Sequence, residues 1–306
     1  MRILITGGTG FIGACLARHL SKDNDVHLVH RPSANTWRLT GVRYTPHHAD
    51  LAVYASVERA VSKIKPEKIF HLAGYGVYPT QTDISTIFQS NVQGTVNLLK
   101  AVKKTGFRSF VFSGSGFEYG LVDKPITESN ELRPPDPYSL SKAAASSFLI
   151  DEAVALDLPI NIARFFLVYG YYEASTRLIP TLINSYAAGQ SPQLASKKNV
   201  RDFVFVDDVV DAVVKISDSG LAGEAFNIGS GKEHSVEQVA ETVRKLFDSR
   251  LMPTWGVAQK RTFEPKHWCA DISKAKRILG WEPKYSLEEG LKKMIEWHRV
   301  DNREKP

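Results

Sequence analysis

The sequence is poor in cysteine, has no long apolar run and carries no strong excess of charge. Its two cysteines, Cys15 and Cys269, exclude a disulfide framework, and without a charged-then-apolar leader we expect a cytoplasmic, reduced protein. The longest apolar runs have the length of a strand, so no membrane segment is predicted. The formal charge of +6 is modest and spread along the chain, which favours a small anionic ligand over nucleic acid.

Other absences narrow the fold and the chemistry. There is no internal repeat or low-complexity tract, and apolar and charged residues make up 43% and 24% of the chain, as in an ordinary globular protein. At 306 residues the chain exceeds one typical domain, so we expect a long α/β domain with or without a smaller lobe. No metal site is indicated, because the adjacent His47 and His48 lack the i, i+4 spacing with which two imidazoles on a helix bind one ion.

A glycine-rich turn directly follows the first predicted strand. Residues 2–6 (RILIT) are β-rich, the run GGTGFIG follows without a gap, and residues 14–21 have helical spacing. In this context Gly7 permits the tight turn, Gly10 lets the backbone approach a pyrophosphate, and Gly13 allows close helix packing. The helix N-terminus attracts phosphate. The predicted cofactor contacts in this turn are Gly7, Gly10, Phe11, Ile12 and Gly13.

The second predicted strand, residues 26–30, ends in Arg31 rather than in an acidic residue. An acid there would accept hydrogen bonds from a ribose 2′-hydroxyl, whereas an arginine suits a 2′-phosphate. We therefore predict NADP(H) over NAD(H), with a solvated surface arginine as the alternative. Asp50 and Leu51 close the next strand region, where the acid could meet the adenine amino group.

Two further predicted strands end in small or hydroxyl residues. They span residues 68–72 and 109–113, and a doubly wound sheet admits its ligand at the carboxyl ends of its strands. We therefore place Leu72, Ala73 and Gly74 at a ligand cleft. A hydroxyl in the run SGSG, at the end of the second of these strands, is placed to touch a bound carbonyl, although a simple turn serine is the alternative.

Tyr138 and Lys142 lie four residues apart at the start of a predicted helix, residues 139–157. The prolines of the preceding run PPDP bar helix before Tyr138. Side chains four residues apart share one face of a helix, so the ammonium can sit against the phenol and favour the phenolate. This spacing alone is more often a solvated helix face, and the surrounding motifs give it weight.

Several short motifs follow one another along the chain. They are TGGTGFIG at 6–13, HLAG at 71–74, NVQGT at 91–95, SGS at 113–115 with Tyr119-Gly120, YSLSK at 138–142, RDFVFVDD at 201–208, DISKA at 271–275 and LGW at 279–281. With these motifs the chain resembles, over nearly its whole length, an extended short-chain dehydrogenase/reductase of the nucleotide-sugar epimerase/dehydratase/reductase group.

The resemblance implies a Rossmann-type α/β fold with about seven mostly parallel strands, doubly wound, and a smaller C-terminal substrate-binding lobe. We expect the dinucleotide-binding domain at 1–165, completed by roughly 201–228, and the lobe at 166–200 and 229–306. Further predicted elements are the helices 91–103, 177–188, 235–247, 271–279 and 286–300, the strands 161–166 and 224–229, and a strand-to-helix run at 201–208.

The resemblance also assigns roles. Tyr138 would be the general acid/base, Lys142 would lower its pKa and hold the nicotinamide ribose, and Ser115 would hydrogen-bond the reacting oxygen. Hydride delivered to a carbonyl leaves an alkoxide that must receive a proton, so the chemistry itself demands a positioned acid. Additional cofactor contacts implied by the resemblance are Asn91, Ser113, Tyr138, Lys142 and Phe165.

The implied substrate is a nucleotide-diphosphate sugar, whose diphosphate suits the bidentate guanidinium of arginine. The implied substrate contacts are Ser115, Gly116, Phe117, Tyr138, Leu167, Arg177, Arg201 and Arg261. A homodimer is expected through a helix bundle formed by residues 91–103 and 139–157.

Departures from the family pattern narrow the reaction. Dehydratases of the family have an Asp-Glu pair directly after the residue matching Ser115, where this chain has Gly116-Phe117, so dehydration is not expected. Decarboxylating members carry a glutamate at the position of Phe117, and here Glu118 comes one residue later. Epimerising reductases use an additional Cys/His pair, which neither cysteine supplies. Leu167 stands where many relatives have an asparagine contacting the substrate phosphate.

Ketoreduction and 4-epimerisation remain. We predict an NADP(H)-dependent ketoreductase acting on a nucleotide-linked 4-keto-6-deoxy sugar, with Tyr138 as the acid. One alternative is a nucleotide-sugar 4-epimerase with tightly bound NAD, against which Arg31 argues mildly. Another is a non-catalytic NADP-binding regulatory protein, which would have little reason to retain Ser115, Tyr138 and Lys142 together.

Overall fold

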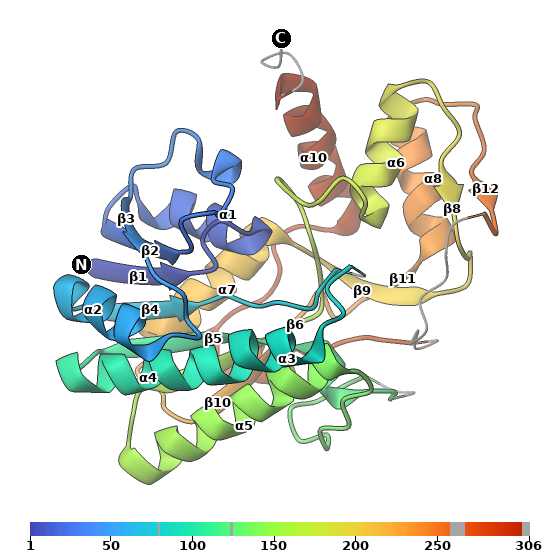
Figure 1. The fold of residues 1–306 in the computed structure, drawn as a ribbon. Coiled ribbons are helices and arrows are strands. Elements are labelled where there is room, and N and C mark those ends of the chain that lie inside the picture. The colour runs from blue at the N-terminus through green and yellow to red at the C-terminus, as the bar shows by residue number, and fades with distance from the viewer. Residues whose placement is uncertain (79, 123–124, 258–266, 302–306) are drawn as a thin grey trace.

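A parallel sheet forms the centre of the protein, whose computed structural model describes residues 1–78, 80–122, 125–257 and 267–301. Seven strands lie in the order β10-β6-β5-β4-β1-β2-β3, and each neighbouring pair is parallel (Figure 1). The predicted doubly wound α/β sheet of about seven strands is confirmed. Its strands are β1 (Arg2–Thr6), β2 (Asp25–His30), β3 (Thr45–His48), β4 (Lys68–His71), β5 (Ser109–Ser115), β6 (Ile160–Phe165) and β10 (Glu224–Ile228).

Alternating side chains of the strands build one apolar core on each face of the sheet. In β1, Ile3 and Ile5 belong to the first core and Leu4 to the second, because successive residues of a strand point to opposite faces. Figure 1 shows the covering helices in two layers. They are α1 (Phe11–Leu20) and α7 (Val206–Asp218) on the first face, and α2 (Tyr54–Ile64), α4 (Gly94–Thr105) and α5 (Pro137–Leu156) on the second.

Two helices begin elsewhere than the sequence predicts. Helix α5 starts at Pro137 rather than at residue 139. Proline is tolerated there because the N–H groups of the first turn have no acceptor within the helix. Asp136 caps this turn by accepting a hydrogen bond from the backbone N–H of Ser139 at 2.9 Å. Helix α4 starts at Gly94 rather than at residue 91, because residues 89–93 form a π-helical turn after α3 (Ile84–Phe88). Such turns are frequent at functional sites.

The C-terminal part of the chain builds a third apolar cluster beside the sheet. Strand β9 (Val200–Phe205) and helices α6 (Leu178–Ala187), α8 (Val236–Leu246) and α10 (Leu287–Asp301) contribute to it. Shorter elements are β7 (Leu167–Tyr169), β8 (Gln193–Leu194), β11 (Glu233–Ser235) and β12 (Thr254–Trp255).

Part of the predicted lobe packs on the sheet instead. Helix α9 (Ser273–Leu279) packs against β10, and Ala275 and Trp281 are buried in the first core. The indole Nε1 of Trp281 donates to the carbonyl of Asp208 on α7 at 3.1 Å. The division into domains stays a prediction. Among the described residues, no helix is long and apolar enough to cross a membrane.

Candidate active site

The glycine turn between β1 and α1 is tightly packed. Gly7 has a φ of 74°, and a Cβ there would lie 2.5 Å from backbone atoms of Leu72 and Ala73. A Cβ on Gly13 would lie 2.2 Å from the carbonyl oxygen of Gly7. Helix α1 follows Gly10 without a side-chain cap, so no cap side chain uses its first N–H groups, which include those of the predicted contacts at positions 11 and 12. A phosphate at this helix N-terminus would be stabilised by these groups.

A buried histidine supports this turn from behind. His71 at the end of β4 lies 2.5 Å, Nδ1 to Oγ1, from Thr6 and 2.8 Å, Nε2 to Oγ1, from Thr95. Burial lowers the pKa of His71 to about 3, so the ring is neutral and can donate through one nitrogen and accept through the other. From the sequence, His71 had no predicted role beyond its place in a motif. It joins β1, β4 and α4.

The three predicted catalytic side chains meet at the carboxyl end of β5. Ser115 ends this strand, Tyr138 lies in the first turn of α5, and Lys142 follows one turn later. Ser115 lies close enough to the Tyr138 phenol to affect its pKa. The Nζ atom of Lys142 donates to Ser113 Oγ at 3.3 Å and lies 4.4 Å from the ring centroid of Phe112. The cofactor contact predicted for Ser113 therefore lies at the same centre.

The protonation of Tyr138 differs from the expectation. Burial raises the pKa of the phenol, and the nearby Glu118 carboxylate raises it further. Lys142 lies against β5 instead, and burial lowers its own pKa to about 8. In this structure the loss of water around the phenol outweighs the effect of the neighbouring Arg177, so the pKa of Tyr138 is raised. The lowering of this pKa by Lys142 stays a prediction.

Asn91 supports the loop after β4, and its predicted cofactor contact stays a prediction. Its Oδ1 accepts from the backbone N–H of Tyr75 at 2.8 Å, and its Nδ2 donates to Tyr75 O and to Ser141 Oγ, both at 2.8 Å. Both side-chain N–H groups are therefore used within the protein. Asn91 joins the loop after β4 to α5, and a Cβ on Gly74 in that loop would lie 3.6 Å from Lys142 Nζ.

Aromatic side chains fill the space directly after Ser115. Gly116 and Phe117 begin a short 3₁₀ turn, η3 (Gly116–Tyr119). The Phe117 ring stacks on Trp268 with centroids 4.4 Å apart, and Phe166 packs against the same indole at 4.8 Å. A Cβ on Gly116 would lie 2.7 Å from Trp268 Cζ2. Position 116 therefore has no room for a side chain unless Trp268 moves.

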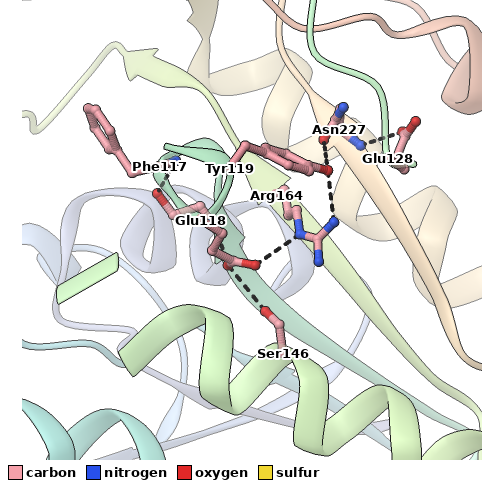
Figure 2. A network of polar contacts seen from close by, with 8 residues as sticks. Phe117, Glu118, Tyr119, Glu128, Ser146, Arg164 and Asn227 are labelled. Carbon is pink, nitrogen blue, oxygen red and sulfur yellow. Dashed lines mark hydrogen bonds and ion pairs between the residues drawn. The ribbon is translucent and has the colours of Figure 1, made fainter. Parts of the chain in front are cut away.

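A buried polar network surrounds Glu118, as Figure 2 shows. Glu118 is fully buried, and its Oε1 accepts from the backbone N–H of Ser115 at 2.7 Å and from Ser146 Oγ at 3.1 Å. Its Oε2 accepts from Arg164 Nε on β6 at 2.9 Å, and Arg164 Nη1 donates to the hydroxyl of Tyr119 at 2.8 Å. The sequence assigned no function to Glu118, and its only signal was an acid directly before the Tyr-Gly pair.

The other predicted substrate contacts are spread over several elements. Arg177 precedes α6, its guanidinium lies 5.6 Å from the ring centroid of Tyr78, and its charge acts on the reaction centre. Leu167 opens β7 and is partly buried. Arg201 is buried on β9 and donates through Nη1 to a backbone carbonyl of its own strand at 2.7 Å. Arg261 lies outside the described residues.

The remaining predicted cofactor contacts follow the carboxyl ends of three strands. Arg31 follows β2 and is exposed, and Asp50 and Leu51 come shortly after β3. Phe165 ends β6 and pairs in register with Ser115 on β5. A ligand lying along this edge of the sheet would run from Arg31 past the glycine turn to Ser115.

Comparisons with known proteins identify the family. The family model described as GDP-mannose 4,6 dehydratase matches residues 4–294. The dTDP-glucose 4,6-dehydratase of Salmonella typhimurium is 28% identical over 97% of this chain and 92% of that protein. The crystal structure of UDP-glucose 4-epimerase with UDP-glucose from Thermotoga maritima has a TM-score of 0.92 at 29% identity, covering 99% of this chain and 100% of that one.

A further solved structure contains a cofactor. The dTDP-glucose 4,6-dehydratase from Bacillus anthracis in complex with NAD has a TM-score of 0.88 at 25% identity, covering 99% of this chain and 98% of that one. A doubly wound sheet with a glycine turn at its first crossover is a dinucleotide-binding fold. The chain belongs to the extended short-chain dehydrogenase/reductase family, within its epimerase/dehydratase group.

Proposed function

We propose that the protein is an NADP(H)-dependent ketoreductase of nucleotide-linked 4-keto-6-deoxy sugars. The observation that carries the proposal is a complete Ser115, Tyr138 and Lys142 centre next to Gly116 and an aromatic cluster of Phe117, Phe166 and Trp268. Dehydratases of the family carry an acid pair at these two positions. Here a side chain on Gly116 would collide with Trp268. Reduction of a ketone needs one positioned acid and no such pair.

The reacting oxygen would be handled by two hydroxyl groups. When bound, the reduced nicotinamide cofactor supplies the hydride. Ser115 and Tyr138, whose hydroxyl groups lie near each other, would hold the substrate carbonyl oxygen, and Tyr138 would give its phenolic proton to that oxygen. The raised pKa of Tyr138 keeps this proton in place at neutral pH. Lys142, with a pKa of about 8, is largely protonated there and would stabilise the phenolate left behind.

Features of the chain itself support a dinucleotide cofactor. The glycine turn is packed so tightly that Gly7 and Gly13 have no room for a Cβ, and the uncapped N-terminus of α1 suits a pyrophosphate. Ser113 and Lys142 would hold the nicotinamide ribose. The exposed Arg31 after β2 suits a 2′-phosphate, which supports NADP(H).

A 4-epimerase is the second candidate. It is favoured by the high structural similarity to the Thermotoga maritima UDP-glucose 4-epimerase, with a TM-score of 0.92 over 99% of this chain. The same Ser115 and Tyr138 hydroxyls would serve an epimerase, because removing and returning a hydride at C4 also requires proton transfer at the C4 oxygen.

The fate of the hydride distinguishes the two reactions. The purified protein is incubated with NADPH deuterated at C4 on the transferred face and with a nucleotide-linked 4-keto-6-deoxy sugar. A reductase leaves deuterium at C4 of the product and consumes one NADPH per turnover, which is followed by the reduced-nicotinamide absorbance. Interconversion of two 4-hydroxy sugar nucleotides without added cofactor and without label uptake would instead identify the epimerase. If neither reaction occurs, the proposed function is wrong.

A further inference from the structure

A contribution to the stability of the fold does not by itself explain why the Glu118–Arg164 ion pair is buried. The Glu118 and Arg164 side chains are 0% and 4% exposed. Burying both charges costs desolvation free energy that their attraction repays only with good geometry, and apolar residues of similar volume are often as stable. The position of the carboxylate beside Ser115 therefore points to a role in the reaction centre.

Glu118 and Ser115 hold each other through a reciprocal cap. The Ser115 hydroxyl oxygen accepts from the backbone N–H of Phe117 at 3.2 Å, while the Glu118 carboxylate accepts from the backbone N–H of Ser115 at 2.7 Å. One lone pair of the serine oxygen is therefore used, which fixes the side-chain orientation. The O–H and the second lone pair remain for Tyr138 and for a substrate oxygen.

The carboxylate is itself held from three sides. Arg164 comes from β6, Ser146 comes from α5, and Ser115 ends β5. Figure 2 shows the Glu118 side chain pointing from η3 toward the helix that carries Tyr138 and Lys142. The negative charge is thus fixed between the end of β5 and Ser146 of α5, one helical turn after Lys142.

We propose that Glu118 is a positioning residue of the reaction centre, which fixes Ser115 through the cap and places a buried negative charge next to Tyr138 and Lys142. Arg164 is its anchor. This inference rests on the proposed function, in which a reductase or an epimerase would use the same acid/base centre. Glu118 would act on that centre without touching the substrate.

The charge of Glu118 has a definite effect on both neighbours. It raises the pKa of the Tyr138 phenol, which keeps the acid protonated, and it opposes the burial that lowers the pKa of Lys142. Lys142 would lose its proton more readily without this carboxylate.

The other charged or titratable groups around the reaction centre have effects that differ from that of Glu118. His71 on β4 is buried and neutral, with a pKa lowered to about 3. Asp136 at the start of α5 raises the pKa of Tyr138, and Arg177 lowers it. Arg164, the cation that faces Glu118 from β6, is the partner of the carboxylate itself.

A matched control exists at the far end of the same network. Tyr119 donates its hydroxyl proton to Asn227 Oδ1 at 2.8 Å, and the backbone N–H of Asn227 donates to Glu128 Oε1 at 2.8 Å. Glu128→Gln removes a partly buried carboxylate from this end, where it contacts neither Ser115 nor Tyr138. If the network only supports the fold, changes at Glu118 and Glu128 should have similar effects.

The test is a lysine titration by NMR on the full chain labelled with ¹³C at the lysine ε-carbons, with the Lys142 signal assigned by Lys142→Arg. Glu118→Gln should lower the titration midpoint of Lys142 by on the order of one pH unit, and Glu128→Gln should leave it unchanged. Glu118→Gln leaves Arg164 buried without a counter-charge. The double variant Glu118→Gln/Arg164→Gln replaces the ion pair with a neutral amide pair and is measured in parallel. It should show the same change in the Lys142 midpoint.

Turnover supplies the second measurement. Misplacement of Ser115 should lower kcat of the Glu118 variants by about tenfold to a hundredfold, with unchanged NADPH affinity and little change in KM. The proposal is overturned if the Lys142 titration is the same in both Glu118 variants and the wild type, or if Glu128→Gln shifts it equally. It is also overturned if neither Glu118 variant folds, since the pair would then serve the fold.

The NMR titration does not depend on any reaction. If the wild type turns over no sugar nucleotide but the Lys142 midpoint still depends on Glu118, the proposed function fails and the positioning role stands. If turnover is found and the Lys142 midpoint does not depend on Glu118, the proposed function stands and the positioning role fails.

Discussion

Burial of single side chains determines the pKa values of the reaction centre at the end of β5. Tyr138 is kept protonated because burial and a nearby carboxylate both oppose the phenolate, and burial lowers the pKa of Lys142 to about 8. The two pKa values therefore move apart: that of Lys142 falls toward neutral pH, so the ammonium can give up its proton, and that of Tyr138 rises away from it, so the phenol keeps its proton. Such opposed environments are typical of acid/base sites.

At this scale, Tyr138→Phe should reduce turnover by at least ~10²-fold, because it removes the acid that protonates the reacting oxygen. Steady-state kinetics and a fluorescence titration with NADPH measure the effect, and cofactor affinity should be nearly unchanged. Tyr54→Phe, on helix α2, is the matched control and should retain wild-type kinetics. Near-normal turnover of Tyr138→Phe would remove this residue from the mechanism.

Cofactor choice should depend on Arg31. Arg31→Asp should weaken NADPH binding and improve NADH binding, because a carboxylate repels the 2′-phosphate and accepts hydrogen bonds from a free 2′-hydroxyl. The dissociation constants of both cofactors are measured for the wild type, for this variant and for Arg43→Asp, an exposed arginine before β3 that should change neither value. Tighter binding of NADH than of NADPH by the wild type would show that Arg31 does not have this role.

At the scale of the elements, two buried polar side chains join the segments around the carboxyl ends of the strands. His71 bridges β1 and α4 from its place on β4, and Asn91 in the π-helical turn joins the loop after β4 to α5. Both satisfy their hydrogen bonds within the protein. The glycine turn, the strand ends and the helix bearing Tyr138 are thereby fixed relative to one another before any ligand binds.

His71 should make stability depend on pH in a defined window. Its pKa falls from 6.5 to about 3 on folding, so between these values the unfolded chain binds more protons and the free energy of unfolding falls as pH falls. Above pH ~6.5 this contribution is fully present. Urea unfolding at several pH values should show a steeper loss for the wild type than for His71→Gln.

His48→Gln is the control for this measurement. It replaces an exposed histidine on the edge strand β3 and should keep the wild-type dependence on pH. Equal slopes for the wild type and for His71→Gln between pH 6.5 and 4 would contradict a buried neutral His71.

At the scale of the whole molecule, α4 and α5 present a continuous outer face on one side of the sheet (Figure 1). A shallow hollow between them is lined by Val96, Leu99 and Phe148 together with lysines of α4 and Glu152. Apolar side chains at the ends of α5 are also exposed, including Leu140 at 47% and Val154 at 73%. Exposed apolar area of this kind favours association with a copy of the same surface.

We therefore predict a homodimer in which α4 and α5 pair with the same helices of a second copy around a two-fold axis. Light scattering at micromolar concentration should give twice the monomer mass of 34.1 kDa. Phe148→Lys should shift the population toward the monomer, while Met252→Lys, an apolar-to-lysine change of a 63% exposed residue before β12, should not. A monomer mass for the wild type would refute the dimer.

The sequence by itself determined the sheet, the glycine turn and the family, because these depend on local signals. Strand-length apolar runs separated by helical patterns predict a parallel sheet, and the run GGTGFIG directly after the first strand predicts the phosphate-binding turn. The Tyr138/Lys142 spacing and the preceding prolines likewise placed both side chains on one turn of a helix. Each of these inferences uses residues that are neighbours along the chain.

Contacts between distant segments were decided only by the tertiary structure. Trp268, 152 positions after Gly116, closes the space beside it, and Arg164 becomes the partner of Glu118 because β6 lies next to β5. The side-chain bonds of Asn91 and the raised pKa of Tyr138 also depend on packing that no local pattern encodes. Burial and the pairing of charges arise from surroundings that the fold assembles, so protonation and positioning at this centre could not be predicted from the order of its residues.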